Sequence, residues 1–236
     1  MLLLIAAEKQ RRSRNRIADY FPDTGACRRE LYPKHMQFFA AGGKHTPFPS
    51  CPEGCDGAPH RERCFMAANR VGKSDAGAYE TTLHLTGNYP KWWTGKRFDR
   101  AIKAWACGDT NKTVREVLQE KLYGKVSSPG TGMIPGDAIT HRTTKQGIAE
   151  AVDTIYVKHA SGGTSSVSFK SYQEGRESFQ GSAIEVLWFD EEPDSTLYTE
   201  GLMRTMTTGG ICYLTFTPLQ GLSTVVLSFL PNGVPG

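Results

Sequence analysis

Residues 67–74, with the sequence Ala-Ala-Asn-Arg-Val-Gly-Lys-Ser, constrain the fold of this chain more than any other stretch. They follow the apolar run 64–66 and precede a helix-compatible segment over residues 74–85. A glycine-containing turn between a strand and a helix directs backbone N–H groups and the positive end of the helix dipole at one point, an arrangement that binds phosphate. Lys73 would reach the terminal phosphates of a nucleotide, and the Ser74 hydroxyl would bind Mg²⁺. The expected nucleotide-binding residues of this loop are Ala67, Asn69, Arg70, Val71, Gly72, Lys73 and Ser74.

The first position of the loop departs from the usual phosphate-binding pattern, which begins with Gly where this chain has Ala67. An alanine does not reach positive φ cheaply. We therefore expect the chain to enter the loop at Ala67 with a negative φ. The alternative is a degenerate loop in a catalytically silent nucleotide-binding or DNA-binding module.

A second motif lies at residues 184–193, where the run Ile-Glu-Val-Leu-Trp-Phe leads into Asp-Glu-Glu-Pro. A buried parallel strand of this kind delivers carboxylates to the crevice at its carboxyl end. Asp190 could hold Mg²⁺ there, through the bound nucleotide, and Glu191 could orient and deprotonate an attacking water. A buried strand followed by a solvated acidic turn is the alternative, but two motifs in this order favour the catalytic interpretation.

Strand and helix signals alternate along the chain, which predicts an α/β fold with a mostly parallel central sheet and helices on both faces. The expected type is the P-loop NTPase with an additional strand (ASCE type), in which a strand separates the phosphate loop from the acidic strand. We expect strand 101–107 between them. The expected strands are 64–68, 101–107, 185–190 and 211–217, with a hairpin at 153–159 and 166–172, and the expected helices are 74–85, 112–123 and 195–207.

The organisation predicted from composition is a basic helical leader over residues 1–30, followed by an ATPase domain over 31–236. Basic residues follow the apolar start of the leader, and a solvated helix face is favoured over a DNA contact for them: Lys9, Arg11, Arg12, Arg14 and Arg16. The net charge of +4 is compatible with a nucleic-acid partner without requiring one. No apolar stretch is long enough to cross a bilayer, so we expect a soluble intracellular protein without a membrane partner.

Residues 46–60 form an insertion rich in Cys, Pro and Gly. A zinc site made of Cys51, Cys55 and His60, with His45 as a fourth ligand, is conceivable there. The spacing does not match common ligand patterns, and a flexible loop with two reduced thiols is favoured. A zinc-dependent interaction protein therefore stays among the alternative functions.

The loop 67–74, the acidic tip 190–193 and the Thr-Phe-Thr-Pro at 215–218 resemble the large terminase subunits of tailed bacteriophages. The stretches 161–163, 169–172, 175–177 and 179–181 are similar as well. The resemblance implies an ATPase that uses ATP and Mg²⁺ to package double-stranded DNA into a prohead. It also implies a homo-oligomeric ring on the portal protein, a small terminase subunit as partner, and action in the host cytoplasm.

The same resemblance implies further roles. Thr215 and Thr217 would couple hydrolysis to movement, and Arg70 would stabilise charge on the transferred phosphoryl group. Arg176 is a second candidate, reaching the site of a neighbouring subunit. Gln37 lies where such ATPases read adenine with an amide, although an exposed helix face explains it equally well.

Members of this family join the ATPase to a C-terminal nuclease. No later set of acids follows the last motor strand in this sequence, so we expect ATP hydrolysis without DNA cleavage. The remaining alternative is another DNA-dependent ATPase of the same fold, such as a helicase.

Overall fold

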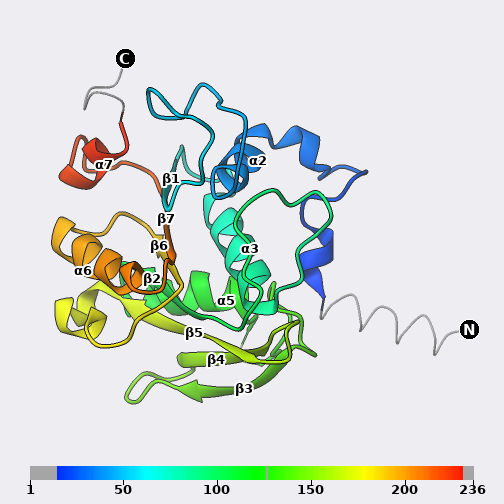
Figure 1. The fold of residues 1–236 in the computed structure, drawn as a ribbon. Coiled ribbons are helices and arrows are strands. Elements are labelled where there is room, and N and C mark those ends of the chain that lie inside the picture. Colours follow the sequence, from blue (N-terminus) through cyan, green and yellow to red (C-terminus); the bar gives the residue numbers. More distant parts are fainter. Residues whose placement is uncertain (1–14, 126, 231–236) are drawn as a thin grey trace, which may run out of the picture.

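The computed structural model describes residues 15–125 and 127–230. One seven-stranded sheet, in the order β1-β7-β6-β2-β5-β4-β3, forms its centre (Figure 1). The strands are β1 (Glu62–Met66), β2 (Lys103–Gly108), β3 (Ile139–Thr144), β4 (Val152–Lys158), β5 (Thr164–Ser171), β6 (Val186–Asp190) and β7 (Ile211–Phe216). Strands β1, β7, β6, β2 and β5 are parallel, and β4 and β3 continue the sheet as antiparallel strands. The prediction of a mostly parallel sheet and of the β4–β5 hairpin is confirmed.

The strand between the phosphate loop and the acidic strand is β7, and not the segment 101–107 that we expected there. β1 pairs with β7, which pairs with β6, whereas β2 lies on the far side of β6. The expectation was wrong because β2 and β7 are both short apolar strands, and apolar character alone does not fix which strands are neighbours. β7 suits the inner position since all of its residues are buried.

Helices cover both faces of the sheet, as predicted (Figure 1). On one face α3 packs against β6 and β7, and on the other α6 does so, with residues of α7 and of a 3₁₀ turn in the same hydrophobic cluster. The helices are α2 (Pro33–Ala40), α3 (Lys73–Thr86), α4 (Asn111–Thr113), α5 (Glu120–Leu122), α6 (Ser195–Met206) and α7 (Thr224–Ser228). The 3₁₀ turns are η1 (Arg16–Asp19), η2 (Arg29–Leu31), η4 (Tyr172–Glu174) and η5 (Arg176–Phe179).

The helix expected over residues 112–123 contains a π-helical segment. Six residues, η3 (Val114–Gln119), adopt the π form between α4 and α5. Short π-helical segments inside α-helices are frequent at functional sites. Here the helical segment carries Lys121, whose ammonium pairs with Asp75 in the first turn of α3 at 2.7 Å.

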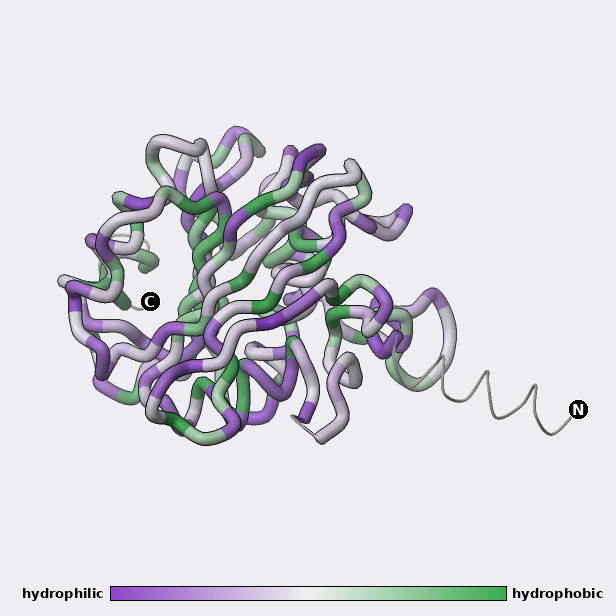
Figure 2. Tube along the Cα trace, turned by 90° about the horizontal axis from the view of Figure 1, so that it is seen from below, coloured by the Kyte–Doolittle hydropathy of each residue, from purple (hydrophilic) through white to green (hydrophobic). Residues whose placement is uncertain are grey.

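β6 is buried along its whole length, and its side chains alternate between the two cores. Trp188 joins the cluster under α3, whereas Leu187 and Phe189 join the cluster under α6. Hydrophobic segments gather in the central strands, and hydrophilic ones lie mainly in the outer loops (Figure 2). A glycine brings each helix close to this strand: a Cβ on Gly77 of α3 would lie 2.3 Å from the Trp188 ring, and one on Gly201 of α6 would lie 2.7 Å from Leu187.

The basic residues 9–14 of the predicted leader lie outside the described residues. After them, Phe21 is buried and packs edge-on against Phe39 of α2 and Tyr79 of α3. Residues 46–60, where the insertion is predicted, contain neither helix nor strand. In the described part of the chain, no helix is both long and apolar enough to cross a membrane.

Candidate nucleotide-binding site

The loop between β1 and α3 turns sharply before the helix begins. Gly72 begins α3 with a φ of +84°, and Arg70 has a φ of +63°, so two left-handed residues turn the chain. Ala67 is not among the residues with positive φ, and its N–H donates to the Phe216 carbonyl of β7, so it continues the strand as predicted. No side chain caps α3, which leaves its first N–H groups available to an anion.

Lys73 ties this loop to the segment after β7. Its side chain is only 8% exposed, and its ammonium donates to the carbonyl of Ala68 at 2.8 Å and to the hydroxyl of Thr217 at 2.9 Å. The Thr217 oxygen also lies 2.8 Å from the Asn69 amide oxygen. Residues from both ends of the loop and from the end of β7 therefore meet around one ammonium.

Asp190 stands at the carboxyl end of β6, 2% exposed, and faces the same loop. Its carboxylate accepts a hydrogen bond from Thr215 at 2.7 Å, and the Ser74 hydroxyl lies near enough to affect its pKa. The indole of Trp188 donates to Thr215 in turn, at 2.7 Å. Burial raises the pKa of Asp190 to about 6, although both hydroxyls act to lower it. A buried carboxylate opposite a serine hydroxyl offers the hard oxygen ligands that Mg²⁺ prefers.

Glu191 follows with a φ of +74°, which is strained for a residue with a side chain. Its N–H donates to the Thr215 carbonyl at 3.2 Å. Burial raises the pKa of its carboxyl, Lys73 lowers it and Asp109 raises it further. Strained backbone of this kind clusters at active sites.

Two residues that the sequence analysis did not assign hold this site in place. The Tyr172 hydroxyl donates to the carbonyls of both Asp190 and Glu191, at 3.2 and 2.8 Å, and so fixes the strained turn. His35 of α2 is buried and contacts the loop: a Cβ built on Gly72 would lie 3.3 Å from its Nε2, and burial lowers its pKa although the backbones of Gly72 and Val71 act to raise it. The signals in the sequence were weak for both: Tyr172 ends a stretch that resembles the terminase family, and His35 lies in an aromatic-rich segment.

The candidate arginines differ in their surroundings. Arg70 is exposed and forms no hydrogen bond or ion pair with another described residue. Arg176, in contrast, donates through Nε to Glu200 of α6 at 2.9 Å. The Arg70 side chain is therefore available to contact a ligand, whereas the Arg176 side chain is paired with Glu200 of the same chain.

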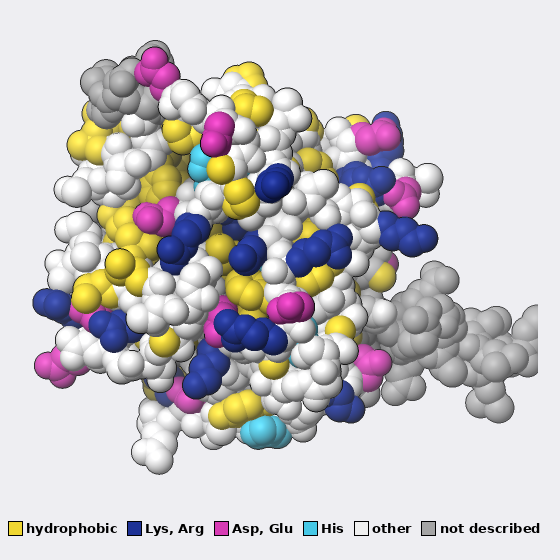
Figure 3. Space-filling model, in the orientation of Figure 1, with side chains coloured by type: hydrophobic (Ala, Val, Ile, Leu, Met, Phe, Trp, Pro, Cys, Tyr) yellow, Lys and Arg dark blue, Asp and Glu magenta, His cyan; other side chains and the backbone are white. Residues whose placement is uncertain are grey.

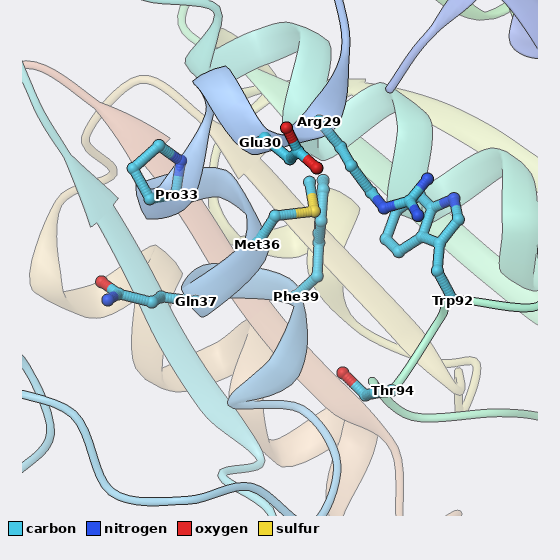
Figure 4. Close-up of a pocket in the computed structure, with 8 residues that line it drawn as sticks. All are labelled: Arg29, Glu30, Pro33, Met36, Gln37, Phe39, Trp92 and Thr94. Atoms are coloured by element: carbon cyan, nitrogen blue, oxygen red, sulfur yellow. The ribbon is translucent and has the colours of Figure 1, made fainter. Parts of the chain in front are cut away.

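Gln37 contributes to a surface cleft of about 470 Å³ that contains none of the phosphate-loop residues. The cleft is lined by Arg29, Glu30, Pro33, Met36, Gln37, Phe39, Trp92 and Thr94. Figure 4 shows Gln37 pointing away from Arg29 and Trp92, which lie beside each other. The amide oxygen of Gln37 is buried without a hydrogen-bond partner among the residues described.

Comparison with known proteins identifies the family. Residues 64–234 match the family model described as terminase large subunit, T4likevirus-type, N-terminal. The chain belongs to the phage terminase large-subunit family. Over 196 residues it is 43% identical to the terminase large subunit of Salmonella phage P22, an alignment that covers 75% of this chain and 39% of that protein. This terminase chain therefore spans about two fifths of the length of that relative.

A solved structure is also similar. It is the large terminase from a thermophilic bacteriophage, determined in complex with ADP. The TM-score is 0.42 at 9% sequence identity, and the match covers 77% of the terminase chain described here and 38% of that structure.

Proposed function

We propose that this chain is the ATPase motor part of the terminase, which hydrolyses the phosphoric anhydride of ATP to drive double-stranded DNA into the prohead. The observation that carries the proposal is the convergence of three segments at the start of α3. Lys73 comes from the loop after β1, Asp190 and Glu191 from the tip of β6, and Thr217 from the segment after β7. Each group has a chemical role in phosphoryl transfer.

The strand order supports assignment to the additional-strand class of P-loop NTPases. β7 lies between β1, which leads into the phosphate loop, and β6, which carries the acids. With one strand between β1 and β6, Glu191 at the tip of β6 would lie across the site from the loop instead of beside it. An acid in that position can act on a water molecule that attacks the terminal phosphate.

The residues present fit a magnesium nucleotide. The uncapped start of α3 and the Lys73 ammonium supply positive potential for phosphate oxygens. Ser74 and Asp190 would hold Mg²⁺, which when bound neutralises charge on the β- and γ-phosphates. The remaining nucleotide contacts would come from the backbone of Ala67, Asn69, Arg70, Val71 and Gly72.

Catalysis by the chain itself rests on three side chains. Glu191 accepts a hydrogen bond from water, orients it and takes its proton. Lys73 and Arg70 stabilise the charge that develops on the phosphoryl oxygens, Arg70 as a planar donor that suits phosphate. Arg176 could serve a neighbouring subunit after its bond to Glu200 opens, and Gln37 could bind adenine through its amide.

DNA binding belongs to the same proposal. A motor that moves along any sequence must hold DNA by its phosphates. Lys and Arg side chains are spread across the middle of the face in Figure 3. The proposed assembly is a ring on the portal protein, with the small terminase subunit as partner, in the host cytoplasm, and family membership supports it.

The decisive experiment measures ATP binding and ATP turnover in matched variants, with and without DNA and over a range of protein concentrations. Lys73→Ala should abolish turnover and weaken binding, whereas Glu191→Gln should keep binding and block hydrolysis by about 10²–10⁴-fold. Glu192→Gln is the matched control, because its carboxylate accepts a hydrogen bond from Ser223 instead of facing Lys73. Binding without turnover at any concentration would mean a silent module, and strand separation by the protein would mean a helicase.

A further inference from the structure

We infer that His45, Cys51, Cys55 and His60 bind one Zn²⁺ ion in a tetrahedral site, on the connection between α2 and β1. This site is separate from the proposed ATPase centre and adds a structural metal to the protein. The four side chains come together although they are spread over residues 45–60, and their ligand atoms all lie within 4.8 Å of one another.

The distances between these ligand atoms match a zinc site. The Nε2 atom of His45 lies 3.5 Å from the sulfur of Cys51 and 3.6 Å from that of Cys55, and Nε2 of His60 lies 3.5 Å from the Cys55 sulfur. A tetrahedral Zn²⁺ with bonds of about 2.3 Å to sulfur and about 2.0–2.1 Å to nitrogen holds these atom types roughly 3.5 Å apart. Two thiolates and two imidazoles are ligands that favour zinc over Mg²⁺ or Ca²⁺.

Contacts outside the four ligands orient them. Nδ1 of His45 lies 2.9 Å from the carbonyl of Gly43, which fixes the ring so that Nε2 faces the sulfur atoms. The N–H groups of Phe48 and Gly57 approach the sulfurs of Cys51 and Cys55 at 3.5 and 3.4 Å. N–H donors placed in this way stabilise a thiolate, the form that binds metal.

The backbone is shaped to bring the two ends of the segment together. His45 donates its N–H to the Gly57 carbonyl at 3.0 Å, and Gly57 has a φ of +80°. A Cβ at Gly57 would lie 2.1 Å from the His45 carbonyl oxygen, so only glycine fits. The N–H of His60 donates to the Ala41 carbonyl, which fixes the fourth ligand next to the end of α2.

A bound metal would have a clear physical role here. Residues 41–61 contain no helix or strand, and loops longer than about 12–15 residues without such structure are uncommon in compact domains. Closing this loop with Zn²⁺, with release of the two thiol protons to solvent, would fix the entry into β1. β1 in turn leads directly into the phosphate loop.

The test is the zinc content of the protein purified without chelators, measured by mass spectrometry of the metal. We expect about one zinc per chain, and less than about 0.1 in Cys51→Ser and in His60→Asn. Cys27→Ser is the matched control, because Cys27 is a free, exposed cysteine outside the cluster and its loss should leave zinc unchanged.

A second measurement does not depend on how well these variants fold. Cobalt added to the wild-type protein after zinc removal should give the visible absorption of a tetrahedral two-thiolate site. In a separate measurement, His45→Cys, which replaces one zinc ligand by another, should keep bound zinc. Absence of zinc together with absence of this spectrum would overturn the proposal, as would a Cys51–Cys55 disulfide found by mass spectrometry. Neither readout requires ATP turnover, so this inference and the proposed ATPase function can fail separately.

Discussion

The ammonium of Lys73 donates a hydrogen bond to the hydroxyl of Thr217 over 2.9 Å, and so joins two segments that are 144 positions apart in the sequence. Thr217 lies just after β7, the strand inserted between the loop strand and the acidic strand. A movement of the Lys73 side chain would therefore change or break a hydrogen bond at the end of β7.

This contact predicts that Thr217→Val lowers the ATP turnover number by about tenfold to a hundredfold, because a hydrogen bond to a charged group contributes about 1.5–3 kcal/mol. Thr217→Ser keeps the hydroxyl and should stay within about twofold of the wild type. Steady-state kinetics of both variants measure this, and equal turnover in Thr217→Val and the wild type would contradict the proposed role.

The contact between His35 and the backbone of Gly72 predicts a role in shaping the loop. His35→Phe should keep the aromatic packing against Phe21 and Phe65 and weaken ATP binding by about fivefold, because it removes a polar contact worth about 1 kcal/mol. Titration calorimetry with a non-hydrolysable ATP analogue measures the affinity. His141→Phe is the control, since His141 is exposed on β3, and a similar loss there would argue against a local effect.

The raised pKa of Asp190 predicts how stability depends on pH in the protein without nucleotide or magnesium. A carboxyl whose pKa rises from about 3.9 in the unfolded chain to about 6 in the folded protein binds its proton more tightly when folded. Its contribution to stability is therefore full below pH 4, falls as the pH rises to about 6, and changes little above that. The total is on the order of 3 kcal/mol.

Asp190→Asn should remove this dependence and raise the melting temperature at pH 8 by roughly 5–10 °C. Thermal unfolding of both proteins between pH 4 and 8 measures it. Parallel curves for the variant and the wild type would mean that Asp190 does not carry the effect. Magnesium and nucleotide should stabilise only the wild type strongly, since the variant has lost its negative charge.

A buried ion pair joins β1 to α3, and its loss should strongly lower the stability of the fold. Arg63 of β1 and Glu80 of α3 lie 2.6 Å apart with side chains 4% and 0% exposed. Arg63→Met should lower the free energy of unfolding by roughly 3–5 kcal/mol, because it leaves Glu80 as a buried charge without its arginine partner. Arg28→Met, which removes an exposed pair with Glu30, should cost less than about 1 kcal/mol in the same urea titration.

The proposed catalytic role of Arg70 can be tested, together with the question of whether it acts on its own subunit or on a neighbouring one. Arg70→Ala should reduce turnover by about 10³-fold or more if this side chain stabilises the transferred phosphoryl group. Mixing Arg70→Ala with Glu191→Gln should restore activity only if the arginine acts on a neighbouring subunit. Unchanged turnover in Arg70→Ala alone would remove it from the catalytic residues.

The loop and the acidic strand could be predicted from the sequence because each is a short local pattern with a fixed chemical meaning. In the structure Ser74 affects the pKa of Asp190 and Lys73 affects that of Glu191, so the two segments lie near each other, and the helix after the loop begins one residue earlier than predicted. The neighbour of β1 could not be predicted, since β2 and β7 have similar apolar patterns. The contributions of Tyr172 and His35 depend on packing between distant elements, which leaves no local signal.

The grouping of side chains in the cysteine-rich insertion was also not predictable from the sequence. The spacing of Cys51, Cys55 and His60 argued against a metal site, because it fits no common ligand pattern. The chain path brings His45 into the group from outside the insertion, and it does so through a glycine turn whose geometry the sequence does not reveal.

The two glycines that let α3 and α6 approach β6 have a mechanical consequence. With Trp188 and Leu187 pressed against helices on opposite sides, the strand beneath Asp190 has little freedom to slide or tilt. In the proposed mechanism the acids would therefore stay in place, and any movement after loss of a phosphate would occur in the turns that follow β1 and β7.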